Sequence, residues 1–403
     1  MGCSSSTATG ALQPTRVCTR YEDLVRLCSG DRGGFGCFVL KDMLKVYKDF
    51  IIKKYDLYIA DQLLSDEGKV HFIEKVISDQ SIEGLKIFFA RISTSGKTKS
   101  NSFENEVHLY NYLLNNYPPN LLIVKKLSFL SIINSSTISF SIKANRYSSR
   151  GIPKQFRQID FIFLEACTVD LSRIKPKDIN LNQIIRSMVT YIHSLHKDNI
   201  YHMDIKPENI LLCNKKYKLI DYGLAIKVPS YDTITVDYLQ TQLKKVFGTY
   251  EYVNPMFLVL INQAKYSHNK LYDLNILAKD CGISFLQLQV FMNNYEQFIT
   301  PNGIFFKIDS YLQYIQSAQK EDLYPFLNNL YARADWYAFA KVIFETAGLL
   351  SFENGKAIGD DIMNGIIYLF SLTDKDLNNP TLDIEILNKF KLRRTTVNNF
   401  YKH

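Results

Sequence analysis

The chain has 403 residues, of which 46% are hydrophobic and 22% charged, and its formal net charge is +8 at pH 7. This balance is typical of a folded globular chain with room for two modest domains, and it excludes an intrinsically disordered one. The positive residues are spread along the chain rather than gathered in one block, which disfavours nucleic-acid binding.

The cysteines and the apolar runs further narrow the class of protein. The seven cysteines are odd in number, and no two of them have the C-x-x-C spacing. We therefore expect reduced thiols in a cytoplasmic protein, without a zinc site. No apolar run reaches the ~20 residues that a membrane-spanning helix needs.

The first residues, Met1-Gly2-Cys3-Ser4-Ser5-Ser6, contain a lipidation pattern. Gly2 followed by Ser6 fits N-myristoylation, and Cys3 is a natural site for palmitoylation. Two acyl groups hold a protein firmly to a bilayer, whereas one holds it only marginally. We expect residues 1–20 to be a flexible, acylated leader that tethers the chain to a membrane surface. An unmodified, disordered start is the alternative.

A glycine-rich stretch follows, from Gly30 to Gly36. Glycines let a backbone bend close to phosphate groups and point its amides at them, although any hairpin can contain such a cluster. Further on, the apolar spacing predicts a helix around residues 103–114 and a second helix over residues 171–196.

The densest polar pattern is Tyr201-His202-Met203-Asp204-Ile205-Lys206-Pro207-Glu208-Asn209, followed by two short apolar runs and Asp221-Tyr222-Gly223. The two runs predict a small β-ribbon that brings Asp204, Asn209 and Asp221 together. Two carboxylates and an amide can hold a hydroxyl nucleophile and Mg²⁺. Phosphoryl transfer from a nucleotide requires this combination, since the protein mainly positions groups and neutralises charge.

These residues resemble the catalytic loop and metal-binding turn of eukaryotic-type protein kinases, H-R-D-L-x-x-x-x-N followed by D-F-G. The resemblance implies that Asp204 is the base that orients the substrate hydroxyl. It implies that Lys206 steadies the transferring phosphoryl group, as in serine/threonine kinases, and that Asn209 and Asp221 bind Mg²⁺. It gives His202 a structural role.

Other segments fit the same resemblance. The glycine-rich stretch resembles the loop over the ATP phosphates, and residues 161–167 resemble the strand that enters the hinge, whose backbone pairs with adenine. The residues to which the resemblance gives ATP-binding roles are Gly30, Gly33, Gly34, Phe35, Gly36, Phe38, Lys48, Lys86, Glu106, Glu165 and Cys167.

Two lysines compete for the contact with the ATP phosphates. Lys48 has the distance from the glycines that is usual in the family, whereas Lys86 has the usual distance to Glu106, its expected partner on the predicted helix. One of the two gaps therefore holds an insertion of about 40 residues. The spacing narrowly favours Lys48, and the other lysine is expected to be solvated.

Residues 248–255 resemble the end of a kinase activation segment, G-T-x-x-Y-x-A-P-E, in which Thr249 would bridge Asp204 and Lys206. Met256 replaces the glutamate of that motif, which puts the usual anchoring ion pair in doubt. Met203 replaces the arginine that normally receives an activation-loop phosphate. We therefore expect an activity that does not depend on phosphorylation of this segment.

The C-terminal part contains an inserted segment and a long apolar helix. Residues 257–330 are several times longer than the family has here and look mostly helical. Asp335 is expected to open the helix that follows, and it resembles the aspartate that accepts backbone amides from the catalytic loop as structural support.

The resemblance predicts an α+β, bilobal protein-kinase-like fold. Residues 21–166 would form a small, β-rich N-lobe with an insertion, and residues 167–403 a larger, mostly helical C-lobe with an inserted helical segment at about 257–330. The expected function is that of a serine/threonine protein kinase that uses ATP and Mg²⁺ and acts on protein substrates. A pseudokinase scaffold and a small-molecule phosphotransferase are the alternatives. The insertions resemble those of kinases of large DNA viruses, which would place the protein in a host cell or a virion. The many Tyr, Phe, Ile, Asn and Lys residues suggest an AT-rich coding sequence, which fits this resemblance.

Overall fold

The computed structural model describes residues 37–392, apart from 90, 93–97, 100, 118–121, 123–126, 129–135, 146–151, 153–156, 166–168, 214, 245–251, 267–270 and 301–304. The chain divides into two compact units, one of residues 1–103 and 124–166 and one of residues 104–123 and 167–403. The sequence-based expectation is an N-lobe of residues 21–166. Residues 104–123, which we expected in that lobe, group with the second unit instead.

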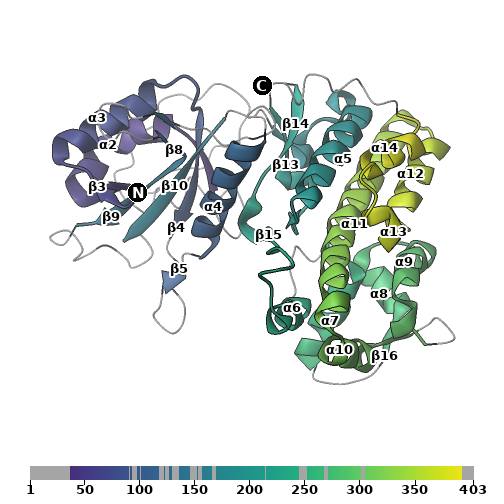
Figure 1. Cartoon of the computed structure of the whole chain (residues 1–403). Helices are drawn as coiled ribbons and strands as arrows, with labels where there is room; N and C mark the ends of the chain where they lie inside the picture. The colour runs from purple at the N-terminus through teal and green to yellow at the C-terminus, as the bar shows by residue number, and fades with distance from the viewer. Residues whose placement is uncertain are drawn as a thin grey trace. The chain divides into compact units, whose positions relative to one another are not determined.

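The first unit is built on a six-stranded antiparallel sheet (Figure 1). Side chains in strand β2 alternate between buried and partly exposed, whereas almost every residue of the central strand β10 is buried. The strand order is β1 (Cys37–Leu40), β4 (Gly84–Phe89), β10 (Gln158–Leu164), β9 (Ser139–Ala144), β2 (Tyr55–Ile59) and β3 (Gln62–Leu63). Two small strand pairs lie outside it: β5 (Arg91–Ile92) with β6 (Thr98–Lys99), and β7 (Leu127–Ser128) with β8 (Ser136–Thr137).

Two helices, α2 (Asp42–Lys54) and α3 (Asp66–Ser78), follow β1 and come before β4 in the chain. Their apolar faces join the core of the sheet, where the ring of Phe72 packs edge-on against Phe140 at a centroid distance of 5.0 Å. Ser65 begins α3 by accepting a hydrogen bond from the Gly68 amide. The stretch between β1 and β4 therefore contains two helices and two strands, all of them ahead of Lys86 in the chain.

The second unit contains two small β-ribbons and the helices around them. One ribbon has the order β11 (Val169–Asp170), β13 (Ile210–Cys213) and β14 (Lys216–Leu219), and the other pairs β12 (Ile200–Tyr201) with β15 (Ile226–Lys227). Helix α5 (Leu181–Lys197) begins after Asn180, whose side chain accepts the amide hydrogen of Gln183.

The greater part of α4 (Asn101–Asn116) and the residues after it are attached to this unit by polar contacts. Asn105 donates to the carbonyl of Ala225 at 3.2 Å, and the Tyr117 phenol donates to the Ser194 carbonyl at 2.8 Å. Both bonds join this stretch to residues beyond 167, in agreement with its place in the second unit.

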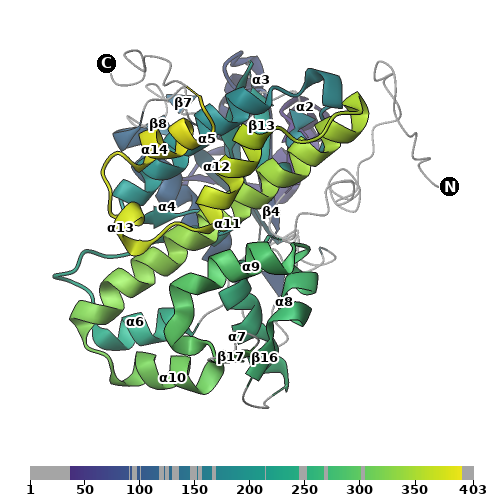
Figure 2. The ribbon, with the colours of Figure 1, turned by 90° about the vertical axis from the view of Figure 1, so that its right-hand side faces the viewer.

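Helix α11 (Lys320–Asn354) is the longest element of the second unit, with 35 residues (Figure 2). Most of its residues from Leu327 to Ala347 are buried, and Asp335 lies near the middle. The prediction that Asp335 opens this helix is therefore wrong. The C-terminal helices α12 (Asp360–Phe370), α13 (Asp374–Leu377) and α14 (Leu382–Lys389) complete the unit, and α12 packs against α11.

The segment between the β-ribbons and α11 is mostly helical and also contains one strand pair that was not predicted. The helices are α6 (Val236–Leu243), α7 (Pro255–Tyr266), α8 (Leu274–Cys281), α9 (Phe285–Met292) and α10 (Ile308–Ser317), and the strands are β16 (Leu271–Asp273) and β17 (Phe305–Lys307).

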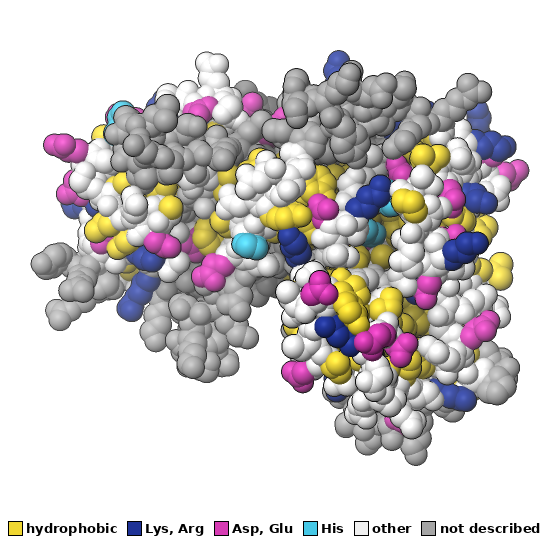
Figure 3. Space-filling view, in the orientation of Figure 1, with side chains coloured by type: hydrophobic (Ala, Val, Ile, Leu, Met, Phe, Trp, Pro, Cys, Tyr) yellow, Lys and Arg dark blue, Asp and Glu magenta, His cyan; other side chains and the backbone are white. Residues whose placement is uncertain are grey.

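Three further expectations concern the whole chain. No helix among the described residues is long and apolar enough to cross a bilayer. Cys213 is disulfide-bonded, so the expectation of reduced thiols is wrong for this residue, and its partner lies outside the residues with described side chains. On the described part of the second unit's face in Figure 3, basic side chains are interspersed with acidic ones.

Candidate active site

The second unit brings together the residues of the densest sequence pattern. In the β13–β14 ribbon Ile210 pairs with Leu219, and the Ile220 amide donates to the carbonyl of Asn209 at 2.9 Å. This register places Asn209 at one end of the ribbon, with Asp221 following directly on the opposite strand. The predicted β-ribbon is therefore present, and it joins the loop to the turn.

The carboxylate of Asp204 is held by two side chains of its own loop. Lys206 Nζ lies 2.9 Å from Asp204 Oδ2, and Asn209 Nδ2 lies 3.0 Å from the same oxygen and 2.8 Å from the Asp204 carbonyl. Asp204 is 8% exposed, so these are contacts in a partly dehydrated environment, where they are stronger than in water. The arrangement fixes the direction of a carboxylate that can accept a proton.

Asp221 and Asn209 provide oxygen atoms suited to a hard cation. Asp221 has φ 66° and ψ 70°, a left-handed conformation that is uncommon for residues other than glycine. Asn209 directs its Nδ2 group to Asp204, which leaves Oδ1 as the atom that can face a metal. Carboxylate and amide oxygens are ligands that Mg²⁺ accepts, so these two residues fit the ion.

Gly223, two residues after Asp221, lies where a side chain would crowd the carboxylates of Asp221 and Glu106. A Cβ atom at Gly223 would lie 3.2 Å from Asp221 Oδ1 and 3.8 Å from Oε2 of Glu106, which is fully buried on α4. The Gly223 amide lies 3.4 Å from Asp221 Oδ1, so the close approach also directs a donor toward the carboxylate.

Asp335 binds the backbone of the loop that contains Asp204. Its two carboxylate oxygens accept the amide hydrogens of Met203 and His202, each at 2.8 Å, and one of them also contacts His196 Nε2 at 3.0 Å. This is the contact that the resemblance predicts for Asp335. Asp335 is 1% exposed and lies on a buried helix, so its own position is well fixed. Through the two amides it therefore fixes the backbone of the loop that carries Asp204.

His202 is an uncharged imidazole that links the loop to the ribbon by hydrogen bonds. Its Nε2 lies 2.9 Å from the Ile220 carbonyl, and its Nδ1 lies 3.4 Å from the Asp204 amide, so Nε2 donates and Nδ1 accepts. Burial lowers the pKa of this imidazole, mainly by desolvating the charged form. The predicted structural role agrees with these contacts.

Tyr222 lies in the turn between Asp221 and Gly223 and is fully buried. Its ring packs edge-on against His202, at a centroid distance of 4.8 Å, and against Tyr110, at 5.2 Å. Its hydroxyl forms a hydrogen bond with the hydroxyl of Tyr191 on α5. The sequence pattern gives no indication of this last contact, because Tyr191 has the same spacing as its apolar neighbours.

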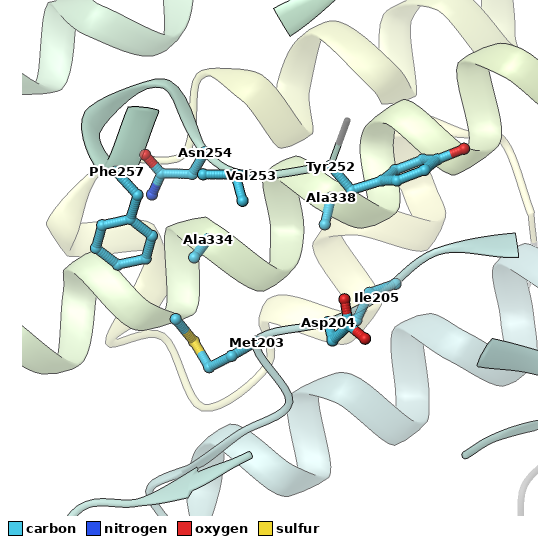
Figure 4. A pocket seen from close by; sticks show the side chains of 9 residues that line it. All are labelled: Met203, Asp204, Ile205, Tyr252, Val253, Asn254, Phe257, Ala334 and Ala338. Atoms are coloured by element: carbon cyan, nitrogen blue, oxygen red, sulfur yellow. The ribbon is translucent and has the colours of Figure 1, made fainter. Parts of the chain in front are cut away.

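A small pocket opens beside Asp204 (Figure 4). One wall is the loop of Met203, Asp204 and Ile205. The opposite wall is the segment of residues 252–254, which leads into α7. Asn254 Oδ1 accepts the amide hydrogen of Met256 at 2.7 Å and so begins α7. The pocket is lined by Met203, Asp204, Ile205, Tyr252, Val253, Asn254, Phe257, Ala334 and Ala338.

The first unit settles where the two competing lysines lie. Lys86 is on β4, between Phe38 of β1 and Ile162 of β10. Lys48 is on helix α2, where its Nζ lies 2.5 Å from Glu74 Oε1 of α3. Lys48, the lysine that the spacing narrowly favours for ATP, therefore lies on a helix and not on a strand beside β1.

The structure describes the remaining predicted site residues only in part. Glu165 directly follows β10 and is partly buried. Phe38 lies on β1, but its side chain is outside the described part. The sites that lie wholly outside the described residues are Gly2, Cys3, Gly30, Gly33, Gly34, Phe35, Gly36, Cys167 and Thr249.

Part of the chain matches a known family and several curated relatives. Residues 161–279 match the family described as protein kinase domain, and this range contains the whole loop and turn. The chain is 32% identical over 117 residues to the serine/threonine-protein kinase MPS1 of Saccharomyces cerevisiae, which covers 27% of this chain and 14% of the relative. It is 36% identical over 91 residues to the smooth-muscle myosin light chain kinase of Gallus gallus, covering 21% and 4%.

A longer match is weaker in identity. It is 23% identical over 241 residues to a probable inactive serine/threonine-protein kinase of Dictyostelium discoideum, covering 58% of this chain and 28% of the relative. The chain thus spans less than a third of the length of each of these relatives. Together the family match and the relatives support a eukaryotic-type protein kinase, with mixed helix and sheet.

Proposed function

We propose that the chain is a serine/threonine protein kinase that transfers the γ-phosphoryl group of ATP to hydroxyl groups of proteins. The observation that carries the proposal is the Asp204 carboxylate, held by Lys206 and Asn209 on a loop whose amides bind buried Asp335. A carboxylate fixed in this way is suited to orient an alcohol for attack.

In the proposed reaction Asp204 accepts a hydrogen bond from the substrate hydroxyl. As the bond between this oxygen and the γ-phosphorus forms, the bond from phosphorus to the β–γ bridging oxygen breaks, and Asp204 takes the proton while ADP leaves. The ammonium group of Lys206, 2.9 Å from Asp204, neutralises negative charge on the transferring group. Its position two residues after Asp204 favours serine and threonine over tyrosine as acceptors.

Asn209 and Asp221 would hold Mg²⁺. The ion, when bound, neutralises charge on the phosphates. The role of this chain is to keep Asp221 in its left-handed conformation and Asn209 Oδ1 turned away from Asp204.

For ATP itself we propose Lys86, with Glu106 as its partner, and the backbone of Glu165 and Cys167 for adenine. The strand position of Lys86 next to β1 supports this choice, since β1 directly follows the glycine-rich stretch. The acylated leader at Gly2 and Cys3, a membrane-tethered cytoplasmic location and a viral type of kinase are proposals that rest on the sequence pattern alone.

Labelled ATP with a mixed protein substrate tests the proposal. We expect label on serine and threonine, none without Mg²⁺, and a large loss in Lys86→Ala but not in Lys48→Ala, because the Lys48 ion pair with Glu74 lies on a helical insertion. A match to a relative described as probable inactive makes a pseudokinase scaffold the second candidate. ATP binding without any transfer would favour it, and label on small molecules only would indicate a small-molecule phosphotransferase.

A further inference from the structure

Lys341 is a lysine buried inside the second unit. It lies on α11, six residues after Asp335, and is 5% exposed. A buried ammonium group is costly unless it is paired or hydrogen-bonded, so its partners indicate what it is for. They include the Cys281 carbonyl, 2.7 Å from Nζ, Glu345 Oε1 at 3.8 Å, and the ring of Tyr252, whose centre is 5.1 Å away.

The first partner belongs to the end of a helix in the inserted segment. Cys281 is the last residue of α8, and carbonyls at a helix C-terminus lack intrahelical donors and carry partial negative charge. Gly282 follows with φ 62°, and a Cβ atom there would lie 3.4 Å from Lys341 Nζ. Lys341 therefore caps α8 from the neighbouring helix.

The second set of partners belongs to the wall of the pocket beside Asp204. The Tyr252 phenol donates a hydrogen bond to Glu345 Oε2, and Lys341 faces the ring of the same tyrosine. Lys341 and Glu345 are one turn apart on α11, so both side chains contact Tyr252 at the same time and fix its position. Figure 4 shows the Tyr252 ring pointing away from Asp204, so Tyr252 acts on the pocket through its backbone.

We propose that Lys341 is a positioning residue, which fixes residues 252–254 beside Asp204 and couples this wall to helix α8. The segment has Met256 where the resemblance leads us to expect an anchoring glutamate, and the clamp on Tyr252 supplies an attachment to α11 in its place. The kinetic consequence rests on the proposed kinase function. Since the clamp acts on the wall beside the substrate hydroxyl, it affects the protein substrate rather than ATP.

The test uses Lys341→Met, which keeps the apolar stem and removes the ammonium group. We expect kcat/KM for a protein substrate to fall about tenfold or more while KM for ATP changes less than about twofold. Amide hydrogen exchange in residues 252–257 and at the end of α8 should become faster. Lys279→Met, an exposed lysine on the same α8, is the matched control and should change neither.

A second variant covers the case in which Lys341→Met does not fold. Tyr252→Leu removes the ring and the phenol from the clamp, and it should give the same loss for the protein substrate with KM for ATP unchanged. Unchanged kinetics and exchange in folded variants would overturn the role of Lys341 and leave the kinase proposal standing. If the wild-type chain transfers no phosphate, the proposed function fails, and hydrogen exchange alone decides whether Lys341 holds the segment.

Discussion

The hydrogen bond between Tyr191 and Tyr222 allows a quantitative prediction about the turn that contains Asp221. Tyr191 is 3% exposed and Tyr222 is fully buried, and burial raises the pKa of both phenols, so both stay neutral in the usable pH range. In the described part of the chain neither hydroxyl has another hydrogen-bond partner. Each phenol therefore depends on the other.

The perturbation is Tyr222→Phe, which removes one hydroxyl and keeps the ring packed against His202 and Tyr110. The remaining Tyr191 hydroxyl is then buried without a partner, which costs ~1–3 kcal/mol in the free energy of unfolding. Tyr191→Phe should cost a similar amount. The double variant removes both hydroxyls and should lie much closer to wild type than the sum of the two single variants.

Urea denaturation of the four proteins provides the assay, and the double-mutant cycle isolates the pairwise energy. We expect a coupling energy of ~1–3 kcal/mol and, because Asp221 adjoins Tyr222, weaker Mg²⁺ activation in both single variants. A coupling energy below ~0.5 kcal/mol, the usual limit of additivity, would refute the reasoning.

Two further predictions concern packing and pH. Gly365→Ala on α12 should lower the free energy of unfolding by ~1–3 kcal/mol, because the added Cβ would collide with the Phe390 ring. Gly348→Ala, whose Cβ would meet no atom within 4 Å, should instead raise the free energy of unfolding by up to ~1 kcal/mol. Equal effects of the two substitutions in thermal unfolding would contradict this. Burial lowers the pKa of His202 and His193 in the folded state, so the unfolded chain binds more protons and stability falls as the pH drops below ~6.5, the unfolded value. Urea titrations from pH 7.5 to 5.5 should show a shallower loss in His202→Gln, and an identical slope would refute the assignment.

The local motifs were predictable because their chemistry depends on residues close in sequence. Asp204, Lys206 and Asn209 lie within six positions, and a two-strand ribbon is enough to bring Asp221 beside them. The contact of Asp335 with the loop spans more than 130 residues, and only the family resemblance indicated it.

The errors have physical causes. Lys48 was narrowly favoured for its distance from the glycines, although the buried residues Met43, Leu44, Tyr47 and Ile51 around it have helical spacing and could have revealed α2. The start of α11 was missed because Pro325, normally a helix breaker, lies inside the helix, where packing overrides local propensity.

The contacts of Tyr191 and Lys341 join elements that are distant in the chain. A buried lysine that caps a neighbouring helix has the same sequence appearance as a solvated one, and its partner here is a backbone carbonyl 60 residues away. Only the three-dimensional structure could show it.

The most direct test of the central claim is the single-turnover rate of phosphate transfer to a protein substrate in wild type and Asp204→Asn. With ATP binding retained, we predict a rate lower by a factor of about 10² to 10⁴ in the variant, the usual contribution of a positioned general base. An Asp204→Asn protein that transfers phosphate at the wild-type rate would contradict the assignment of Asp204 and, with it, the proposed mechanism.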